Sequence, residues 1–225
     1  MNQKHGPSAK IEIVKDGPYL VSGSLPLGEQ WIVTNTEGES LEYKDGKKYP
    51  TAAKYALCRC GHSANKPFCD GTHAKVKFDG AETASRQPYL EQAVTIEGPT
   101  MLLTDAEKLC AFARFCDPKG QVWNLVQQPD SPEVRRLVEH EAGHCPAGRL
   151  VAWDRKTGKP IEPKFEPSLG LIEDTAKHVS GPIWVRGGIP VVSADGKAYE
   201  VRNRMTLCRC GLSANKPFCD GAHAA

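Results

Sequence analysis

The stretch CRCGHSANKPFCDGTH, residues 58–73, recurs almost unchanged near the end of the chain as CRCGLSANKPFCDGAH, residues 208–223. Each copy contains three cysteines and one histidine at the spacing C-x-C-x8-C-x3-H. Thiolates and imidazoles are ligands that transition metals prefer in proteins. The repeat therefore predicts two metal centres of the same design. His62 is not required for this shared chemistry, because Leu212 occupies the matching position of the second copy.

The spacing divides the four side chains of each motif into two pairs. The C-x-C pair can turn both sulfurs toward one metal, and the third cysteine and the histidine are four residues apart, on one face of a predicted short helix. Pro67 before Cys69 and Asp70 after it favour the start of that helix, whose N–H groups would face the thiolates. A single Zn²⁺ and an iron–sulfur cluster both fit these ligand types.

The pattern C-x-C-x2-S-x3-P-x-C-D-G-[STA]-H resembles the signature of the CDGSH iron–sulfur family, the mitoNEET-type proteins, here in a tandem, bacterial-like form. This resemblance implies one 2Fe–2S cluster per motif. The implied metal ligands are Cys58, Cys60, Cys69 and His73 for the first cluster and Cys208, Cys210, Cys219 and His223 for the second. A structural zinc-binding protein is the remaining alternative.

Composition and charge narrow the class of protein. The 225 residues include 29 basic and 27 acidic side chains, a net charge of +2, without a prominent basic run, so we expect neither nucleic acid nor a membrane as partner. Residues 1–17 contain no apolar signal-peptide core, and no apolar run reaches membrane-spanning length. Nine cysteines in such a chain favour metal binding in a reducing compartment. We therefore expect a cytoplasmic protein.

The region before the first motif predicts a small β unit. Short apolar runs occur at residues 11–14, 19–21, 31–33 and 55–57, with turns expected at 16–17, 37–38 and 45–46. A weaker repeat aligns GPYLVSGSLP, residues 17–26, with GPIWVRGGIP, residues 181–190. These two segments are 164 positions apart, whereas the two motifs are 150 positions apart. The first unit therefore has 14 more residues than the second between this segment and its cysteines. We expect them in a longer hairpin near residues 28–50.

Residues 87–178 carry a different pattern, which predicts a small helical insert. We expect strands at residues 92–96 and 150–153. A capping box at residues 104–107 predicts the start of one helix, and Ser131-Pro132 predicts the start of a second helix that ends at Gly143. A turn at 157–158 and a proline-rich connector at 160–170 follow.

Three cysteines in this segment raise the question of a third iron–sulfur centre. Cys110, Cys116 and the Cys145-Pro146-Ala147-Gly148 stretch resemble a divergent, single-cluster ferredoxin-like domain that accompanies some CDGSH motifs. Three thiols do not complete a four-thiolate site, so the centre would be a 3Fe–4S cluster or would take a fourth ligand from His144 or solvent. Buried thiols without a cluster, in a degenerate domain, are the interpretation that this partial match favours. His140 and His144 fit either a metal site or a solvated helix end.

Together these features predict an α+β protein with β units at residues 1–86 and 179–225 and a ferredoxin-like insert at 87–178. Single-motif CDGSH proteins are generally dimers, so the resemblance implies a monomer whose two β units pack on each other about an internal pseudo-two-fold axis.

The expected function is electron transfer or redox sensing with proton-coupled histidine ligands, serving a soluble redox partner. A cluster donor for an acceptor protein is the alternative. The sequence contains no hydrolase triad, P-loop or dinucleotide fingerprint, so we do not expect an enzyme. His223 stands two residues from the last residue of the sequence, and we expect the second cluster to be the more labile.

Overall fold

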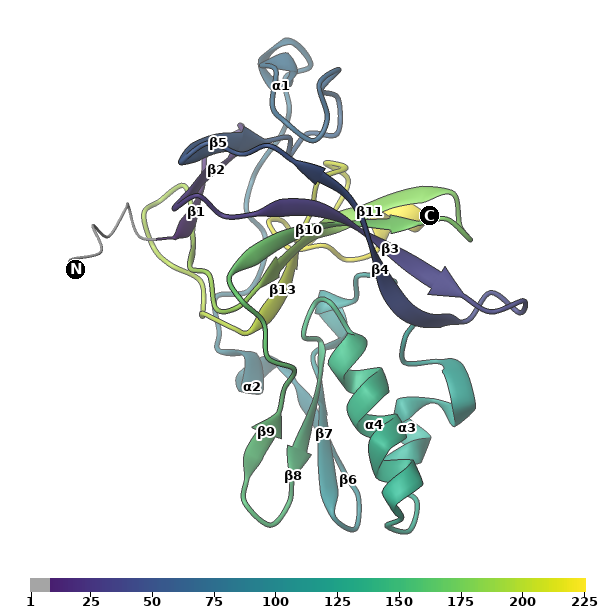
Figure 1. Cartoon of the computed structure of the whole chain (residues 1–225). Coiled ribbons are helices and arrows are strands. Elements are labelled where there is room, and N and C mark those ends of the chain that lie inside the picture. Colours follow the sequence, from purple (N-terminus) through teal and green to yellow (C-terminus); the bar gives the residue numbers. More distant parts are fainter. Residues whose placement is uncertain (1–8) are drawn as a thin grey trace, which may run out of the picture.

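The computed structural model describes residues 9–225 and is mostly sheet with few helices (Figure 1). The strands are β1 (Lys10–Ile13), β2 (Tyr19–Ser22), β3 (Leu27–Thr34), β4 (Ser40–Tyr49), β5 (Lys54–Leu57), β6 (Val94–Glu97), β7 (Met101–Asp105), β8 (Leu150–Asp154), β9 (Lys159–Ile161), β10 (Ser168–Asp174), β11 (Val179–Arg186), β12 (Val191–Val192) and β13 (Arg204–Leu207). The helices are α1 (Thr72–Lys75), α2 (Tyr89–Gln92), α3 (Val122–Leu125) and α4 (Pro132–His144), with 3-10 turns η1 (Glu107–Leu109), η2 (Pro118–Gly120) and η3 (Ala222–Ala224).

The two copies of the repeat form the same antiparallel strand pair. β2 pairs with β5, with Tyr19 opposite Leu57, and β11 pairs with β13, with Ile183 opposite Leu207. These partners are related by the same offsets, 164 and 150, that align the sequences. In each copy the second strand of the pair leads directly into the cysteine motif, so the duplicated piece consists of strands together with the motif.

Two parallel pairings join the halves of the chain. β1 pairs with β12, with Ile11 opposite Val191, and β10 pairs with β3, with Leu169 opposite Leu27. The resulting sheets have the orders β12-β1-β2-β5 and β13-β11-β10-β3-β4, so each half contributes strands to the other half's sheet. The expectation that the two β units pack on each other is confirmed.

The longer hairpin predicted near residues 28–50 is confirmed as β3 and β4, which turn at Glu37-Gly38. The turn expected at Asp45-Gly46 is wrong, because both residues lie within β4. β4 has one extra residue here between its pairings with Gly28 and Gln30, which is a β-bulge. A side chain at Gly46 would collide with Trp31, so glycine serves close packing across the hairpin.

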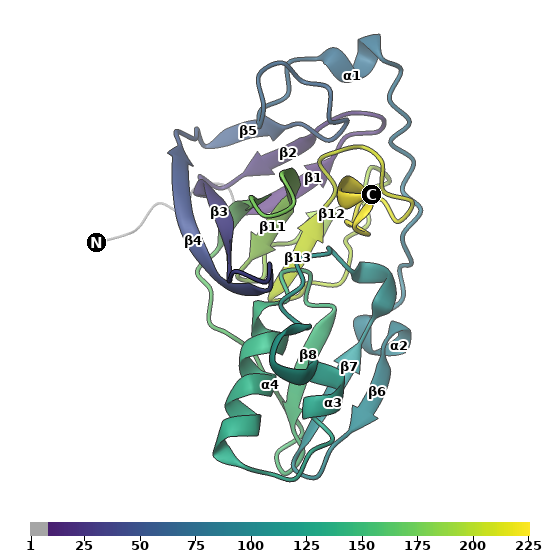
Figure 2. The same cartoon turned by 90° about the vertical axis from the view of Figure 1, so that its right-hand side faces the viewer.

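The middle segment forms its own layer (Figure 2). Its sheet has the order β6-β7-β8-β9, and α4 packs against β8. The helix predicted from Ser131-Pro132 is confirmed, since α4 begins at Pro132 and the Ser131 Oγ accepts a hydrogen bond from the Val134 N–H. The expected strands are found as β6 and β8. The expected connector at 160–170 overlaps β9 and β10, and β10 pairs with strands of the β units, so strand pairing ends the insert before Ser168.

The helix predicted from the capping box at 104–107 is wrong. Met101–Asp105 forms β7 instead, and only the 3-10 turn η1 follows it. The Thr104 hydroxyl does not cap a helix, because it lies buried between the Tyr89 hydroxyl at 2.8 Å and the Trp153 indole N–H at 2.9 Å. Pairing with β6 and β8 on both sides therefore outweighs the local helix signal.

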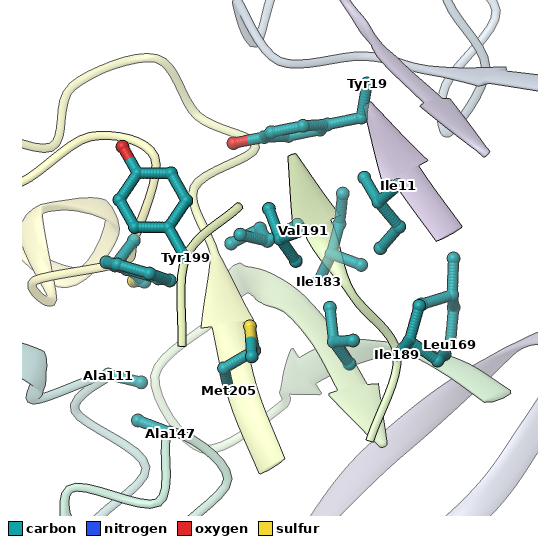
Figure 3. Packing of buried hydrophobic residues seen from close by; sticks show 14 of the residues in the cluster. Ile11, Tyr19, Ala111, Ala147, Leu169, Ile183, Ile189, Val191, Tyr199 and Met205 are labelled. Carbon is teal, nitrogen blue, oxygen red and sulfur yellow. The ribbon is translucent and has the colours of Figure 1, made fainter. Parts of the chain in front are cut away.

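One hydrophobic core lies between the two sheets of the β units, and side chains from both halves point into it (Figure 3). Its members include Ile11, Tyr19, Leu169, Ile183, Ile189, Val191 and Met205, each at most 2% exposed. Ala111 and Ala147 of the middle segment belong to the same cluster. Each large apolar side chain buried here stabilises the fold by about 1.5–3 kcal/mol, so the contact between the halves is a principal source of stability. Within residues 9–225, no helix combines the length and apolar composition needed to cross a membrane.

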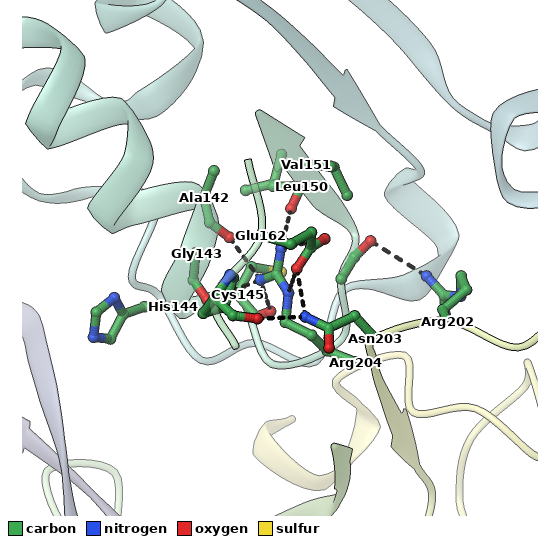
Figure 4. A network of polar contacts seen from close by, with 12 residues as sticks. Ala142, Gly143, His144, Cys145, Leu150, Val151, Glu162, Arg202, Asn203 and Arg204 are labelled. Carbon is green, nitrogen blue, oxygen red and sulfur yellow. Dashed lines mark hydrogen bonds and ion pairs between the residues drawn. The ribbon is translucent and has the colours of Figure 1, made fainter. Parts of the chain in front are cut away.

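A buried arginine joins β13 to the middle segment (Figure 4). The Arg204 side chain is 0% exposed, and its guanidinium makes an ion pair with Glu162 at 2.8 Å. It also donates hydrogen bonds to the backbone carbonyls of Ala142, Gly143, Cys145 and Leu150. Most of these carbonyls lie at the C-terminal end of α4, where they lack helical partners and attract positive charge. Arg204 therefore closes this helix end and fixes it to the second half.

Replacing Arg204 by methionine should lower the free energy of unfolding by about 3–5 kcal/mol, because the buried carbonyls and Glu162 lose their donor. Urea denaturation of the two proteins measures the difference. Arg155→Met is the matched control, since Arg155 and its partner Glu97 are both largely exposed and such pairs contribute at most about 1 kcal/mol. Equal losses in the two variants would contradict the assigned role.

Candidate metal centres

The C-x-C cysteines of each motif lie close enough to share one metal ion. The sulfurs of Cys58 and Cys60 are 3.8 Å apart. Those of Cys208 and Cys210 are 3.7 Å apart. Two sulfurs at about 2.3 Å from one tetrahedral metal are separated by about 3.8 Å, whereas bonded disulfide sulfurs are about 2.05 Å apart. Both pairs thus have the separation of metal ligands.

The third cysteine and the histidine form a second pair. Cys69 Sγ lies 3.4 Å from His73 Nδ1, and Cys219 Sγ lies 3.4 Å from His223 Nδ1. A thiolate and an imidazole nitrogen on one tetrahedral metal are separated by about 3.6 Å. Nδ1 is therefore the histidine atom placed to bind a metal, and Nε2 is left to exchange protons.

The expectation that these two residues share one helix face is wrong. α1 begins only at Thr72 and η3 at Ala222, so each cysteine precedes its helix. Gly71 and Gly221 lie between, with φ of 86° and 89°. This left-handed conformation favours glycine and turns the chain so that the histidine reaches back to the cysteine.

The aspartate of each motif holds this turn. The Asp70 carboxylate accepts hydrogen bonds from the backbone N–H groups of Thr72 at 2.9 Å and Ala64 at 2.8 Å. These bonds hold the pKa of Asp70 well below its usual range, so the carboxylate stays ionised. Asp220 makes the matching bonds in the second motif. The Asp-Gly pair of the signature is thus explained by backbone geometry.

Other residues of the signature also make the same bonds twice. The Ser63 hydroxyl donates to the Phe68 carbonyl at 2.6 Å, and the Cys58 N–H donates to the Pro67 carbonyl at 2.8 Å. The equivalent bonds from Ser213 and Cys208 are 2.7 and 2.8 Å long. The Lys-Pro peptide bond inside each motif, at Pro67 and at Pro217, is cis. Identical sequence therefore builds identical local geometry around both sets of ligands.

The C-x-C loops of the two motifs contact each other. Gly61 packs against the Cys210 carbonyl, and Gly211 packs in the same way against the Cys60 carbonyl. A Cβ at Gly211 would lie 2.6 Å from that oxygen, and both glycines have φ near 80°. Only glycine satisfies the close approach and the positive φ together. The two candidate centres are therefore neighbours across the junction of the halves.

A buried arginine, Arg59, anchors the first C-x-C loop, and the half-buried Arg209 anchors the second. Arg59 donates to the Gly80 carbonyl at 2.6 Å, and Arg209 donates to Ile172 and Glu173 at 2.9 and 2.7 Å. The Tyr19 hydroxyl adds a bond between the halves, because it donates to the Cys208 carbonyl at 2.8 Å. These bonds leave little freedom to either loop, and the positive charges favour thiolates nearby.

The protonation of the thiols also fits a metal centre. A hydrogen bond with Cys210 lowers the pKa of Cys208 to about 6, and the same bond raises the pKa of Cys210. Burial raises the pKa of Cys219 to about 12. The lowered pKa of Cys208 favours the thiolate, which is the form that binds a metal ion.

The third cysteine is more enclosed in the second motif than in the first. Cys219 is 2% exposed, whereas Cys69 is half-buried. The C-x-C pairs have the opposite order, since Cys60 is buried and Cys210 is half-buried. The side-chain amide of Asn215 donates to the Lys108 carbonyl at 2.9 Å, and Gly221 packs against Phe112, so the middle segment covers this motif. The exposure of the third cysteine thus runs opposite to the order of lability expected from the sequence, which stays a prediction.

The three cysteines of the middle segment lie within electrostatic range of one another. Burial, with the charges of Asp117, Cys145 and Cys110, raises the pKa of Cys116. His144 is not turned toward this group, because its Nε2 lies 3.0 Å from Glu42 and its ring points away from Cys145 (Figure 4). The structure therefore does not present His144 as a fourth ligand there.

Among the described residues, one trio of cysteine, histidine or acidic side chains brings its ligand atoms within 4.8 Å of one another: Glu42, His140 and His144. Neither cysteine motif forms such a trio, so its two ligand pairs lie farther apart than the ligands of a single ion. Glu42 was not a candidate from the sequence, because nothing in its neighbourhood on β4 marks it and its partners are about 100 positions away.

The comparisons with known proteins agree with this geometry. A family model described as iron-binding zinc finger CDGSH type matches residues 16–74 and again 180–224. A model described as divergent 4Fe-4S mono-cluster matches residues 96–155. Searches of curated proteins and of solved structures each gave no match.

The class defined by fold, ligands and comparisons is that of iron–sulfur cluster-binding proteins. Within it the chain contains two CDGSH-type domains in tandem, which flank a divergent 4Fe–4S segment.

Gly61→Ala should reduce the iron content of both motifs, because the added methyl group presses on the carbonyl beside a ligand of the other motif. Iron and acid-labile sulfide per chain measure the effect. Gly38→Ala is the matched control: Gly38 has φ of 81° as well, but a Cβ there meets nothing within 4 Å. It should cost only the backbone strain of about 1–2 kcal/mol and leave the iron content unchanged. Equal iron losses would contradict the coupling of the loops.

Proposed function

We propose that the chain binds one 2Fe–2S cluster in each CDGSH motif and serves as a one-electron carrier or redox sensor. The proposed ligands are Cys58, Cys60, Cys69 and His73 for the first cluster and Cys208, Cys210, Cys219 and His223 for the second. The observation that carries the proposal is the division of each set into two pairs, each with the separation of ligands on one metal. One zinc ion would gather all four atoms within about 4 Å, which neither described motif does.

When bound, such a cluster supplies a one-electron couple. The histidine ligands would couple the uptake of a proton to the uptake of this electron. With Nδ1 directed to the metal, Nε2 of His73 and His223 is free to hold a proton, and added negative charge favours that protonated form. Burial and the charge of Arg209 lower the pKa of His223, so this imidazole stays neutral, and able to bind metal, to lower pH. The two sites are thus expected to differ in their response to acid.

The proposal includes an internal pseudo-two-fold axis and a monomeric state. The reciprocal strand pairings, Ile11 with Val191 and Leu169 with Leu27, support it, as do the mutual contacts of Gly61 and Gly211. Such an arrangement would pack two equivalent cluster-binding units about an axis within one chain, as a two-fold dimer packs two subunits. Neighbouring clusters would let an electron accepted at one motif reach the other.

The protein would transfer only an electron in this role, so it acts on no organic substrate and is not itself an enzyme. Its partner is a soluble redox protein that approaches the more exposed first motif. We place the protein in a reducing compartment such as the cytoplasm, because all nine cysteines, each within the described residues, are free.

Cluster donation is the second candidate function, and the half-buried Cys69 beside the exposed α1 favours it. A ligand at the surface can be exchanged by an incoming thiol of an acceptor. Transfer of the cluster to an apo-ferredoxin would support the donor, whereas repeated reduction and oxidation without loss of colour would support the carrier.

A third centre at Cys110, Cys116 and Cys145 is part of the proposal. The match of the middle segment to a divergent 4Fe–4S family supports it. Three cysteines leave one cluster position to solvent or to a ligand other than His144.

Iron, sulfide and the visible spectrum of the purified chain test the cluster assignment. Two 2Fe–2S clusters require about four irons and four sulfides per chain, and a third centre raises the iron count to about seven or eight. Zinc in place of the clusters would give a colourless protein without acid-labile sulfide, and that result would remove the proposal.

The midpoint potential should fall as pH rises, by up to about 59 mV per pH unit where one proton accompanies one electron. The double variant His73→Cys, His223→Cys should flatten this dependence and lower the potential, because thiolates replace the protonatable imidazoles. Potentiometric titration at several pH values measures both effects. His62→Gln is the control, since His62 lies beside the first motif outside the proposed ligands. A slope that survives in the double variant would reject the proton coupling.

A further inference from the structure

We propose that Glu42, His140 and His144 form a binding site for one divalent transition-metal ion, separate from both cysteine motifs. The site lies where β4, from the first half of the chain, meets the end of α4 in the middle segment. It uses none of the eight proposed cluster ligands.

The three side chains converge as ligands of a single ion do. His140 and His144 are one helical turn apart on α4, with ring centroids 3.9 Å apart. Glu42 faces both rings, with one oxygen 3.0 Å from His144 Nε2 and the other 4.0 Å from His140 Nδ1. Two nitrogen or oxygen ligands on one tetrahedral ion are separated by about 3.3 Å, a value between these two distances.

Backbone carbonyls fix which nitrogen of each ring carries a proton. His144 Nδ1 lies 2.8 Å from the His140 carbonyl, and His140 Nε2 lies 3.0 Å from the Leu41 carbonyl. Carbonyl oxygens only accept hydrogen bonds, so both of these nitrogens are donors. His144 Nε2 and His140 Nδ1 are then left with free lone pairs that face the Glu42 carboxylate. Histidine ligands of metals typically donate their other ring N–H to a carbonyl or carboxylate in this way.

A cation between the three groups resolves an unfavourable arrangement. Without one, two lone pairs and a carboxylate face each other with no proton among them. Protonation of His144 would create an ion pair with Glu42, but it would leave His140 Nδ1 without a partner 4.0 Å away. One metal ion satisfies all three atoms at once.

The rings are held in place before any ion binds. The Tyr43 ring lies parallel to the His144 ring, with 6.1 Å between centroids, and Phe115 packs on it at 5.3 Å. The Tyr43 hydroxyl also donates to the His144 carbonyl at 3.2 Å. Burial lowers the pKa of His140, which favours the neutral form that binds metals.

Two imidazoles and one carboxylate suit ions of the zinc and ferrous-iron class. Three protein ligands leave at least one position open for water, as in reactive rather than structural metal sites. The three side chains themselves line a cleft of about 440 Å³, together with Gln30, Phe165 and Arg186. Nearby Glu139 is not a ligand in this arrangement, because it is paired with Arg135 at 3.0 Å.

Isothermal titration of the cluster-loaded full chain with Zn²⁺ tests the site. We expect one binding event whose affinity falls by at least about ten-fold in Glu42→Gln and in His144→Gln. Glu42 is exposed and glutamine has its shape, so this variant keeps the fold. Glu37→Gln and His178→Gln alter an exposed glutamate and an exposed histidine outside the trio, and they should bind as the parent does.

X-ray absorption at the zinc edge identifies the ligands independently. The proposed site requires a shell of nitrogen and oxygen alone at about 2.0–2.2 Å, lost in Glu42→Gln. Sulfur at about 2.3 Å would place the zinc on cysteines and overturn the proposal. The absence of binding, or equal affinity in Glu42→Gln and the parent chain, would overturn it as well.

Discussion

Two parallel strand pairings between the halves hold this structure together. β1 with β12 and β10 with β3 place a strand of each half in the sheet of the other, and the main core lies between the two sheets. Neither half can bury its apolar face without the other. The same pairings place Gly61 and Gly211 against the opposite motif. The distance between the two cysteine motifs is therefore set by how the strands of the two halves pair.

Each motif is a rigid loop held by its own backbone. The bonds of Asp70 and Ser63 are local and recur at Asp220 and Ser213 with nearly the same lengths. Differences between the sites come from outside the motif. The Tyr19 hydroxyl donates to the second motif, and the middle segment covers that motif. The first motif ends in α1, which lies at the end of the molecule opposite the middle segment (Figures 1 and 2). Nearly identical loops therefore have unequal exposure, which can separate their chemistry.

The middle segment is part of the same molecule rather than an appendage. Arg204 binds the end of α4, and Ala111 and Ala147 enter the core of the β units. The helix end that Arg204 closes also carries His140 and His144, which meet β4 from the first half. Fixing this junction thus fixes both the cover over the second motif and the histidine–glutamate trio.

The sequence by itself determined the repeated cysteine–histidine motif, the longer hairpin and the start of α4, because these depend on residues close together in the chain. It misled at 104–107, where a capping pattern lies in β7, and at the cysteine–histidine pair, where Gly71 turns the chain before the helix begins. Only the tertiary structure decided which strands pair across the halves, that the motifs touch, and that Glu42 meets His144. These contacts join residues about 100 or more positions apart, and no local pattern records such a pairing.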